Sequence, residues 1–236
     1  MILLRPGLVP YGQALAWQLQ LRQRLQEGRA HHPTGYLLCL EHPPVVTLGK
    51  RGRAEDIFGL DQLRDRGTQF FKIDRGGEAT YHGPGQLVVY PVVRLDALGL
   101  GVVDLIRGLA NSLSRALADF GLDADYDTDH PGLWTRTTPP RKIASVGMRV
   151  SGGVTTHGAA VNLINDLIPF SLFVPCGMPN APVTRLLDHL DTPDGCNVEA
   201  FTERFLNHFA AFLDCQFEPL DLAPPPPEEA APSMPL

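Results

Sequence analysis

The stretch from residue 68 to residue 93 reads TQFFKIDRGGEATYHGPGQLVVYPVV. Its two ends, 68–73 and 87–93, are rich in apolar and β-branched residues, as is typical of buried strands. The middle, 75–86, holds four glycines, a proline and almost no apolar side chain. A hairpin turn uses about two to five residues, so this insertion is too long for one. We therefore expect the glycine-rich segment to surround a bound group.

Outside this stretch, strands come in clusters and helices are inserted singly. Apolar residues spaced three and four apart predict helices over 11–27, 102–120 and 198–213, with Gly121 as the C-cap glycine of the second. Further strands are predicted at 2–7, 35–41, 45–49, 132–136, 142–150 and 154–163. Because helices and strands do not alternate, the pattern favours an α+β fold of mixed β-sheets flanked by helices.

Length and composition predict one globular domain. The chain has 236 residues, 44% of them hydrophobic and 19% charged. We expect a single domain over 1–220 and an extended, proline-rich tail over 221–236, which offers few apolar anchors. No apolar run approaches the length of a transmembrane helix, and the N-terminus does not resemble a signal peptide. The sequence therefore predicts a cytoplasmic protein without a membrane partner.

The charges are unevenly distributed. The net charge of −6 argues against nucleic acid as the main partner, because binding phosphates needs a basic surface. No Asp or Glu occurs between His130 and Asn165. Four basic residues fall in this window: Arg136, Arg141, Lys142 and Arg149. The window indicates either a docking site for an acidic partner or anionic substrate, or a chance gap within buried strands.

Cys176 stands out among the four cysteines. Cys39 lies in an apolar strand and is interpreted as a small buried hydrophobe. The cysteine spacings match no zinc site, so no metal is predicted. Cys176 lies between Pro175 and Gly177, where a thiol is more easily reached, although an incidental loop cysteine is the alternative. Because a thiol is mostly protonated at pH 7, a nucleophile there would need a base or a positive neighbour.

Lys142 is the candidate for that neighbour. Lysine occurs only at positions 50, 72 and 142. Arginine keeps its proton in proteins whereas a desolvated lysine can release it, so a base would have to be lysine. A solvated surface lysine is the alternative. His82 and His157 each precede a glycine and are further candidates, with structural or surface roles open for both. The glycine-rich segment is not a P-loop, and the chain has no GxSxG motif.

Several motifs together resemble the lipoate-protein octanoyltransferases, or lipoyl(octanoyl) transferases. In order along the chain they are EHPPVVTLG (41–49), RGGEATYHGPGQLVVYPV (75–92), PRKIASVGMRV (140–150), THGAAVNL (156–163) and PCGM (175–178). The similarity runs from about Leu8 to Leu213. It implies the catalytic-domain fold of lipoate and biotin protein ligases.

The resemblance also implies an activity. Members move an octanoyl (or lipoyl) group from acyl carrier protein to a lysine of apo lipoyl domains, in 2-oxoacid dehydrogenases or the glycine cleavage H protein. This reaction belongs to protein lipoylation and lipoate biosynthesis, and transfer from a thioester needs no cofactor. The catalytic roles fall on Cys176, as the acyl thioester, and on Lys142. Substrate contacts fall on Arg75, Gly76, Gly77, Glu78, Ala79, Thr80, Tyr81, His82, Ser145, Val146, Gly147, His157, Gly158, Ala159 and Ala160.

The residues leave details of this chemistry open. Lys142 can deprotonate Cys176 and then the acceptor amine, or it can stay charged and stabilise the thiolate. We expect the glycine-rich segment to line an acyl pocket, where about six methylenes at about 0.8 kcal/mol each contribute roughly 5 kcal/mol of binding. Backbone N–H groups near Gly77 or Gly147 are candidate oxyanion donors. His82 is expected to orient the segment or the substrate.

Two other functions fit parts of the pattern. An ATP-dependent lipoate or biotin protein ligase on the same fold would bind an acyl-adenylate and need no cysteine nucleophile. The PCGM loop and the YHGPGQ form of the glycine-rich segment favour the transferase. A non-catalytic lipoyl-domain-binding protein would be expected to lack Cys176 or Lys142, and both are present.

Overall fold

A computed structural model describes residues 1–28, 33–175, 177–178, 181–192 and 195–220. The nucleophile candidate Cys176 and the predicted tail 221–236 therefore lie outside the described residues. None of the helices in the described ranges combines the length and the apolar character needed to cross a membrane.

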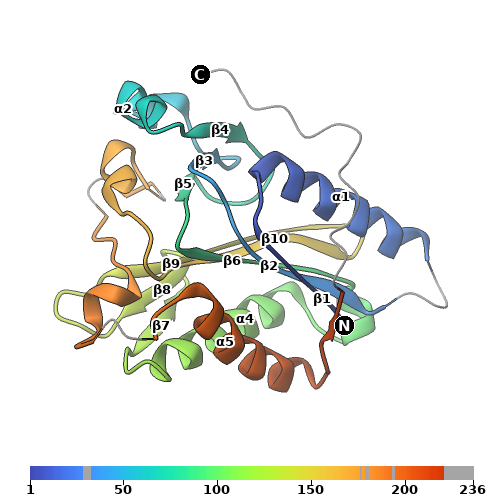
Figure 1. The fold of residues 1–236 in the computed structure, drawn as a ribbon. Coiled ribbons are helices and arrows are strands. Elements are labelled where there is room, and N and C mark those ends of the chain that lie inside the picture. The colour runs from blue at the N-terminus through green and yellow to red at the C-terminus, as the bar shows by residue number, and fades with distance from the viewer. Residues whose placement is uncertain (29–32, 176, 179–180, 193–194, 221–236) are drawn as a thin grey trace.

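An eight-stranded mixed sheet forms the centre of the fold (Figure 1). Its strands lie in the order β11-β1-β2-β6-β10-β9-β8-β7. Strand β1 pairs in parallel with its two neighbours, and the other pairs are antiparallel. The bounds are β1 Ile2–Leu8, β2 Gly35–Glu41, β6 Gln86–Val93, β7 Ala124–Asp127, β8 Gly132–Thr135, β9 Lys142–Ser151, β10 Val154–Asn162 and β11 Glu218–Pro219. Strand β7 was not predicted, because its sequence ADYD lacks the apolar alternation of a strand.

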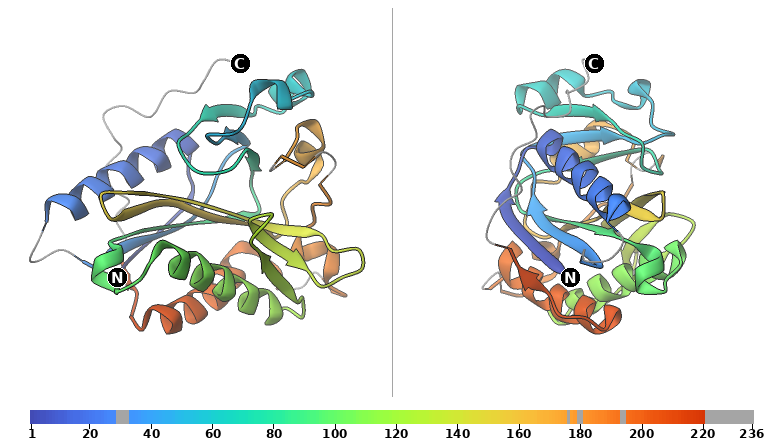
Figure 2. Two further views of the ribbon diagram at one scale, coloured as in Figure 1. Left: turned by 180° about the vertical axis from the view of Figure 1, so that it is seen from behind. Right: turned by 90° about the vertical axis from the view of Figure 1, so that its right-hand side faces the viewer.

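A smaller sheet lies above one face of the large sheet (Figure 2). It has the order β4-β3-β5, with bounds β3 Val45–Leu48, β4 Gln69–Lys72 and β5 Ala79–His82. Strand β5 corrects the prediction of one long non-strand segment over 75–86, because residues 79–82 pair antiparallel with β3. The loop proper is therefore short, and it is held between two strands of this sheet.

Helices cover both faces of the large sheet. Helix α1 (Tyr11–Glu27) packs on the face that also carries the small sheet, through Trp17, Leu21 and Leu25. Helices α4 (Val102–Ala118) and α5 (Val198–Leu213) lie side by side on the opposite face (Figures 1 and 2). The remaining helical segments are short: Ala54–Asp56, α2 Leu60–Asp65, α3 Leu95–Leu98, Ile168–Leu172 and Leu186–His189. This arrangement confirms the predicted α+β fold with mixed sheets and flanking helices.

The ends of the long helices follow local rules. Helix α4 ends at Ala118 with Asp119 as its C-cap, two residues before the predicted end, and Gly121 follows with a φ of 83° and a bond from its N–H to the Ala118 carbonyl. Asn197 caps α5 by accepting the Ala200 N–H at 2.8 Å. Cys39 is buried in β2, as predicted.

Candidate active site

A cavity of about 380 Å³ lies where β5, β9, β10 and α1 meet. Its volume falls in the range of about 300–1,000 Å³ that is usual for small-molecule sites. Thirteen of the fifteen predicted substrate-contact residues line it: Arg75, Gly76, Gly77, Glu78, Thr80, His82, Ser145, Val146, Gly147, His157, Gly158, Ala159 and Ala160. Motifs that are far apart in the sequence are thus brought together around one space.

Strand β5 explains why the other two residues lie elsewhere. Side chains alternate between the two faces of a strand. Thr80 and His82 line the cavity, whereas Ala79 and Tyr81 pack into an apolar cluster with Phe170 and its neighbours. Ala79 and Tyr81 therefore hold the strand in place without lining the cavity.

Small residues form a row across the paired strands β9 and β10. Gly147 lies opposite Gly158, and Ser145 lies opposite Ala160. A Cβ atom at Gly158 would come within 2.1 Å of the Val89 carbonyl oxygen, so this position has no room for a side chain. A Cβ at Gly147 would meet Gly76 O at 3.5 Å, an ordinary contact. The fold could therefore accommodate a side chain at Gly147, but this side chain would occupy part of the cavity.

The Gly76–Gly77 loop is held by its carbonyl groups. The Arg75, Gly77 and Glu78 carbonyls accept hydrogen bonds from the N–H groups of residues 49–51. Gly77 has a φ of 89°, a conformation that favours glycine. Among the described residues, neither the Gly76 nor the Gly77 N–H has an acceptor. Both residues line the cavity, so these two donors are candidates for binding an oxygen there.

His82 lines the cavity as a neutral ring with one protonated nitrogen. The Gln86 Nε2 donates to the Tyr81 carbonyl at 3.1 Å, so the Gln86 Oε1 faces His82 Nδ1 at 2.8 Å and accepts its proton. The Nε2 of His82 is then unprotonated. Burial, with a smaller effect of the neighbouring His42, lowers the pKa of His82 to about 3, so the ring is neutral near pH 7.

His157 adopts a strained backbone conformation. Its φ is 60°, which costs a residue other than glycine about 1–3 kcal/mol. The Gln18 Oε1 accepts the His157 N–H at 2.7 Å, and His157 Nε2 lies 3.3 Å from the Asp74 carboxylate, which also pairs with Arg149. Burial lowers the pKa of His157 to about 3. Asp74 and Gln18, which were not predicted as site residues, thus connect His157 to the start of the glycine-rich segment and to α1.

Lys142 is buried, with 4% of its surface exposed, which contradicts the surface-lysine alternative. Its Nζ donates to the carbonyls of Pro131 at 2.9 Å and His130 at 3.3 Å. It also lies 5.5 Å from the ring centre of Trp134, a favourable position for a cation. This part of the site could not be predicted from the sequence, because backbone carbonyls leave no motif.

The chain on both sides of Cys176 is anchored next to Lys142. Before it, Pro175 forms an isolated parallel bridge with Ala79 of β5. After it, the Lys142 N–H donates to Pro182 O at 2.7 Å, and the Thr184 N–H donates to Lys142 O at 2.9 Å. A cavity of about 10 Å³ is lined by Lys142, Ala144, Ser145, Ala160, Asn162, Phe170, Pro175 and Val183. Ser145 and Ala160 belong to both cavities, so this smaller space adjoins the larger one.

Two buried tyrosines complete the wall near His82, and His42 contacts one of them. Tyr11 and Tyr90 line the cavity, and the Tyr90 hydroxyl lies 2.9 Å from His42 Nε2. His42 Nδ1 donates to Val9 O at 2.7 Å, so its Nε2 accepts the Tyr90 proton. Burial lowers the pKa of His42 to about 4. His42 and Tyr90 lie within the motifs 41–49 and 75–92, but no feature of the sequence predicts their contact.

The acid-free window does not form one free basic surface. Arg136 pairs with Asp125, and Arg149 pairs with Asp74, both of which lie outside the window. Lys142 is buried, whereas Arg141 is exposed. In the described part of the chain, no group of three or more side chains is arranged to hold a metal ion.

Known proteins resemble this chain over most of its length. A family model described as the lipoyl protein ligase A/B catalytic domain matches residues 10–210. The chain belongs to this family. It is 42% identical over 210 residues to an octanoyltransferase from Thermobifida fusca, covering 87% of this chain and 85% of the relative. It is 39% identical over 203 residues to an octanoyltransferase from Acidobacterium capsulatum, covering 81% of each. The predicted membership of the octanoyltransferases is confirmed, and the protein is an acyltransferase.

Solved structures of lipoate and biotin protein ligases share the fold of this chain. A lipoate-protein ligase A bound with ATP superimposes with a TM-score of 0.73 at 19% identity, over 93% of this chain and 88% of the other. A lipoate protein ligase from T. acidophilum with bound lipoic acid gives 0.71 at 18%, over 94% and 89%. The biotin protein ligase from Aquifex aeolicus, in complex with biotin and ATP, gives 0.54 at 14%, over 90% and 70%. The predicted likeness to lipoate and biotin ligases is confirmed at the level of fold.

Proposed function

We propose that this acyltransferase moves an octanoyl (or lipoyl) group from acyl carrier protein to a lysine of an apo lipoyl domain, through a thioester on Cys176. The acceptors are lipoyl domains of 2-oxoacid dehydrogenases and the glycine cleavage H protein. The observation that carries the proposal is the anchoring of Pro175 on Ala79 and of 182–184 on Lys142, beside a cavity suited to an acyl chain. The octanoyltransferase relatives support the choice of acyl group.

In the first step, the Cys176 thiolate attacks the carbonyl carbon of the donor thioester. A new carbon–sulfur bond forms, and the bond to the carrier sulfur breaks, which releases the carrier as a thiolate that takes up a proton from the solvent. Charge on the carbonyl oxygen is stabilised by the N–H groups of Gly76 and Gly77, which lack acceptors among the described residues.

Lys142 acts in this step as a positive charge. Its Nζ donates to two carbonyl oxygens and lies near an aromatic ring, surroundings that suit an ammonium ion. A nearby ammonium favours the thiolate form of a cysteine. Of the two roles that the sequence left open, the contacts favour charge over base in the resting enzyme.

In the second step, the neutral amine of the acceptor lysine attacks the acyl-enzyme. The carbon–nitrogen bond forms, the carbon–sulfur bond to Cys176 breaks, and the amine proton passes to the pair formed by Cys176 and Lys142. Thioester and amine supply everything that the reaction needs, so no cofactor is proposed. The predicted contacts that line the cavity belong to the acyl site in this proposal, whereas Ala79 and Tyr81 support strand β5 from its other face.

The test is the intact mass of the protein after incubation with octanoyl-acyl carrier protein, beside a Cys176→Ser control. We expect a gain of one octanoyl group that hydroxylamine removes and that the control lacks. Absence of this adduct from the wild-type protein would refute the covalent route. Activity that needs ATP and free octanoate, and that survives Cys176→Ala, would identify a ligase instead.

A further inference from the structure

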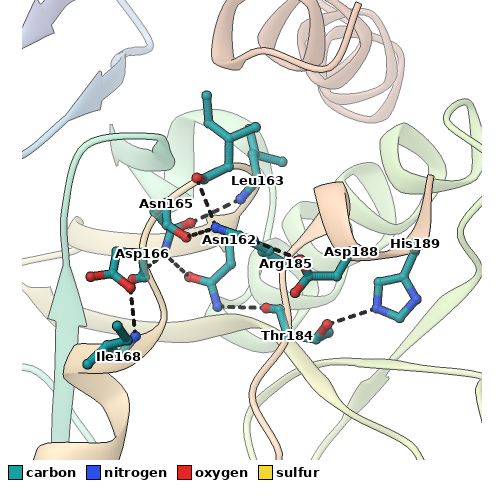
Figure 3. Close-up of polar contacts among 10 residues, drawn as sticks. Asn162, Leu163, Asn165, Asp166, Ile168, Thr184, Arg185, Asp188 and His189 are labelled. Carbon is teal, nitrogen blue, oxygen red and sulfur yellow. Dashed lines mark hydrogen bonds and ion pairs between the residues drawn. The ribbon is translucent and has the colours of Figure 1, made fainter. Parts of the chain in front are cut away.

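The side-chain amide of Asn162, at the end of β10, lies at the small cavity beside Lys142. It is 4% exposed, and its polar atoms are hydrogen-bonded inside the protein. Its Oδ1 accepts from Gln86 Nε2 at 2.8 Å and from Asn165 Nδ2 at 3.1 Å. Its Nδ2 donates to the Thr184 carbonyl at 3.0 Å. Figure 3 shows Asn162 between Asn165 and Thr184, which come from two different loops.

The orientation of this amide is fixed by its partners. Gln86 uses the same Nε2 to donate to the Tyr81 carbonyl, so the atom facing Asn162 is a donor. The Asn162 oxygen must therefore face Gln86, and its nitrogen must face the Thr184 carbonyl. A carboxylate at this position would place an oxygen against the carbonyl oxygen, and a buried carbonyl without a donor is costly.

The hydrogen bonds of Asn162 lead directly to Lys142. Thr184, whose carbonyl the amide holds, donates its own N–H to the Lys142 carbonyl at 2.9 Å. In the other direction, Gln86 links the amide to His82 in the wall of the large cavity. Arg185, the next residue after Thr184, donates to the carbonyls of Ile164 and Asn165, so the two loops are bound at several points (Figure 3).

We propose that Asn162 is a positioning residue for Lys142. Its amide holds Thr184, and Thr184 in turn fixes the backbone from which the Lys142 side chain extends. Asn162 acts through these groups and does not need to touch the substrate. This inference rests on the proposed function, in which Lys142 favours the thiolate of Cys176.

The proposal is tested by the reaction of Cys176 with iodoacetamide, which needs no acyl donor. The full-length protein is labelled over a range of pH, and peptide masses separate Cys176 from Cys196 and Cys215. In Asn162→Asp we expect labelling at pH 7 to slow by about tenfold and its pH profile to move upward, as for a thiol that has lost a positive neighbour. A rate within about twofold of wild type would overturn the proposal.

A double variant shows whether the effect passes through Lys142. In a Lys142→Ala background, we expect Asn162→Asp to change the labelling rate by less than about twofold, because coupled residues are not additive. The same tenfold loss in both backgrounds would show that Asn162 acts independently and would overturn the proposal. If Lys142→Ala itself leaves the labelling unchanged, Lys142 does not act on Cys176 and the proposal also fails.

The control separates positioning from stability. Thr202 in α5 is equally buried and donates to Val198 O at 2.6 Å, far along the chain from the site. Thr202→Val should lower the unfolding midpoint without slowing the labelling.

If Asn162→Asp does not fold, Asn162→Ser serves instead, because a serine hydroxyl is too short to reach the Thr184 carbonyl. A wild-type protein without an octanoyl adduct would refute the proposed function, whereas the labelling experiment tests Asn162 separately.

Discussion

Gly147 allows the proposed acyl cavity to be narrowed without disturbing the fold. A methyl group at this position would meet Gly76 O at 3.5 Å and Arg75 Cδ at 3.6 Å, so Gly147→Ala needs no rearrangement. Alanine also restricts the unfolded chain, which stabilises a protein by about 0.4–1 kcal/mol where the backbone is compatible. Gly77 is less suitable, because its φ of 89° would strain any side chain.

The added methyl group should act on substrate binding. It would occupy space between the row of small residues and the glycine-rich loop, where we place the acyl chain. Each methylene that is displaced from the cavity loses about 0.8 kcal/mol, which lowers kcat/KM about fourfold. Displacement of two methylenes would therefore lower it about fifteenfold.

The assay compares kcat/KM for octanoyl and hexanoyl donors in wild type and Gly147→Ala, together with the unfolding midpoint. We expect a loss for the octanoyl donor, a smaller loss for the hexanoyl donor, and an unchanged or slightly higher midpoint. Gly101→Ala is the control, because Gly101 lies outside the cavity before α4 and its added methyl would meet only the end of the Asp104 side chain. An octanoyl kcat/KM that stays at the wild-type value would refute the placement of the acyl chain.

Three further predictions follow from the buried polar groups. Lys142→Arg should slow the acylation of Cys176 at least about tenfold in single-turnover assays. The reason is that Gly132 and two carbonyls closely surround Nζ and leave no room for a guanidinium group. An acylation rate within about twofold of wild type would contradict this prediction. His157→Gly should adopt the φ of 60° without strain, so the free energy of unfolding should change by less than about 1 kcal/mol. The variant loses the contact with Asp74, so kcat/KM should fall. A variant that does not fold would contradict this prediction. The third prediction concerns the pKa values of three buried histidines, which in the folded protein are about 4 for His42 and about 3 for His82 and His157. In the unfolded chain a histidine has a pKa of about 6.5, so the unfolded chain binds more protons than the folded protein at acidic pH. The free energy of unfolding should therefore fall as the pH drops below about 6.5. At pH 5 each should cost about 2 kcal/mol relative to pH 7, and denaturant titrations of His157→Gly should show about a third less of this loss.

The sequence predicted those parts of the site that depend on local pattern. Apolar alternation located the strands that carry Lys142 and His157, and the glycines marked the loop of residues 75–77. Strand β5 was missed because ATYH stands among glycines and a proline, and its pairing with β3 is a tertiary contact. The polar partners His130, Asn162 and Gln18 were missed for a related reason. Each of these residues forms a hydrogen bond with a residue on another element. Such a contact leaves no periodic pattern in the sequence.

The position of Lys142 illustrates how such contacts combine. Its backbone is bonded on both sides to residues 182–184, which follow the nucleophile candidate. Its Nζ is held by the carbonyls of residues 130 and 131, which precede β8. Residues 130–131 and 182–184, together with β9 itself, thus determine where one ammonium group lies, and a charge that is fixed before the substrate arrives needs no reorganisation during the reaction. A change in any of these segments should therefore alter the reactivity of Cys176, even where it leaves the acyl cavity intact.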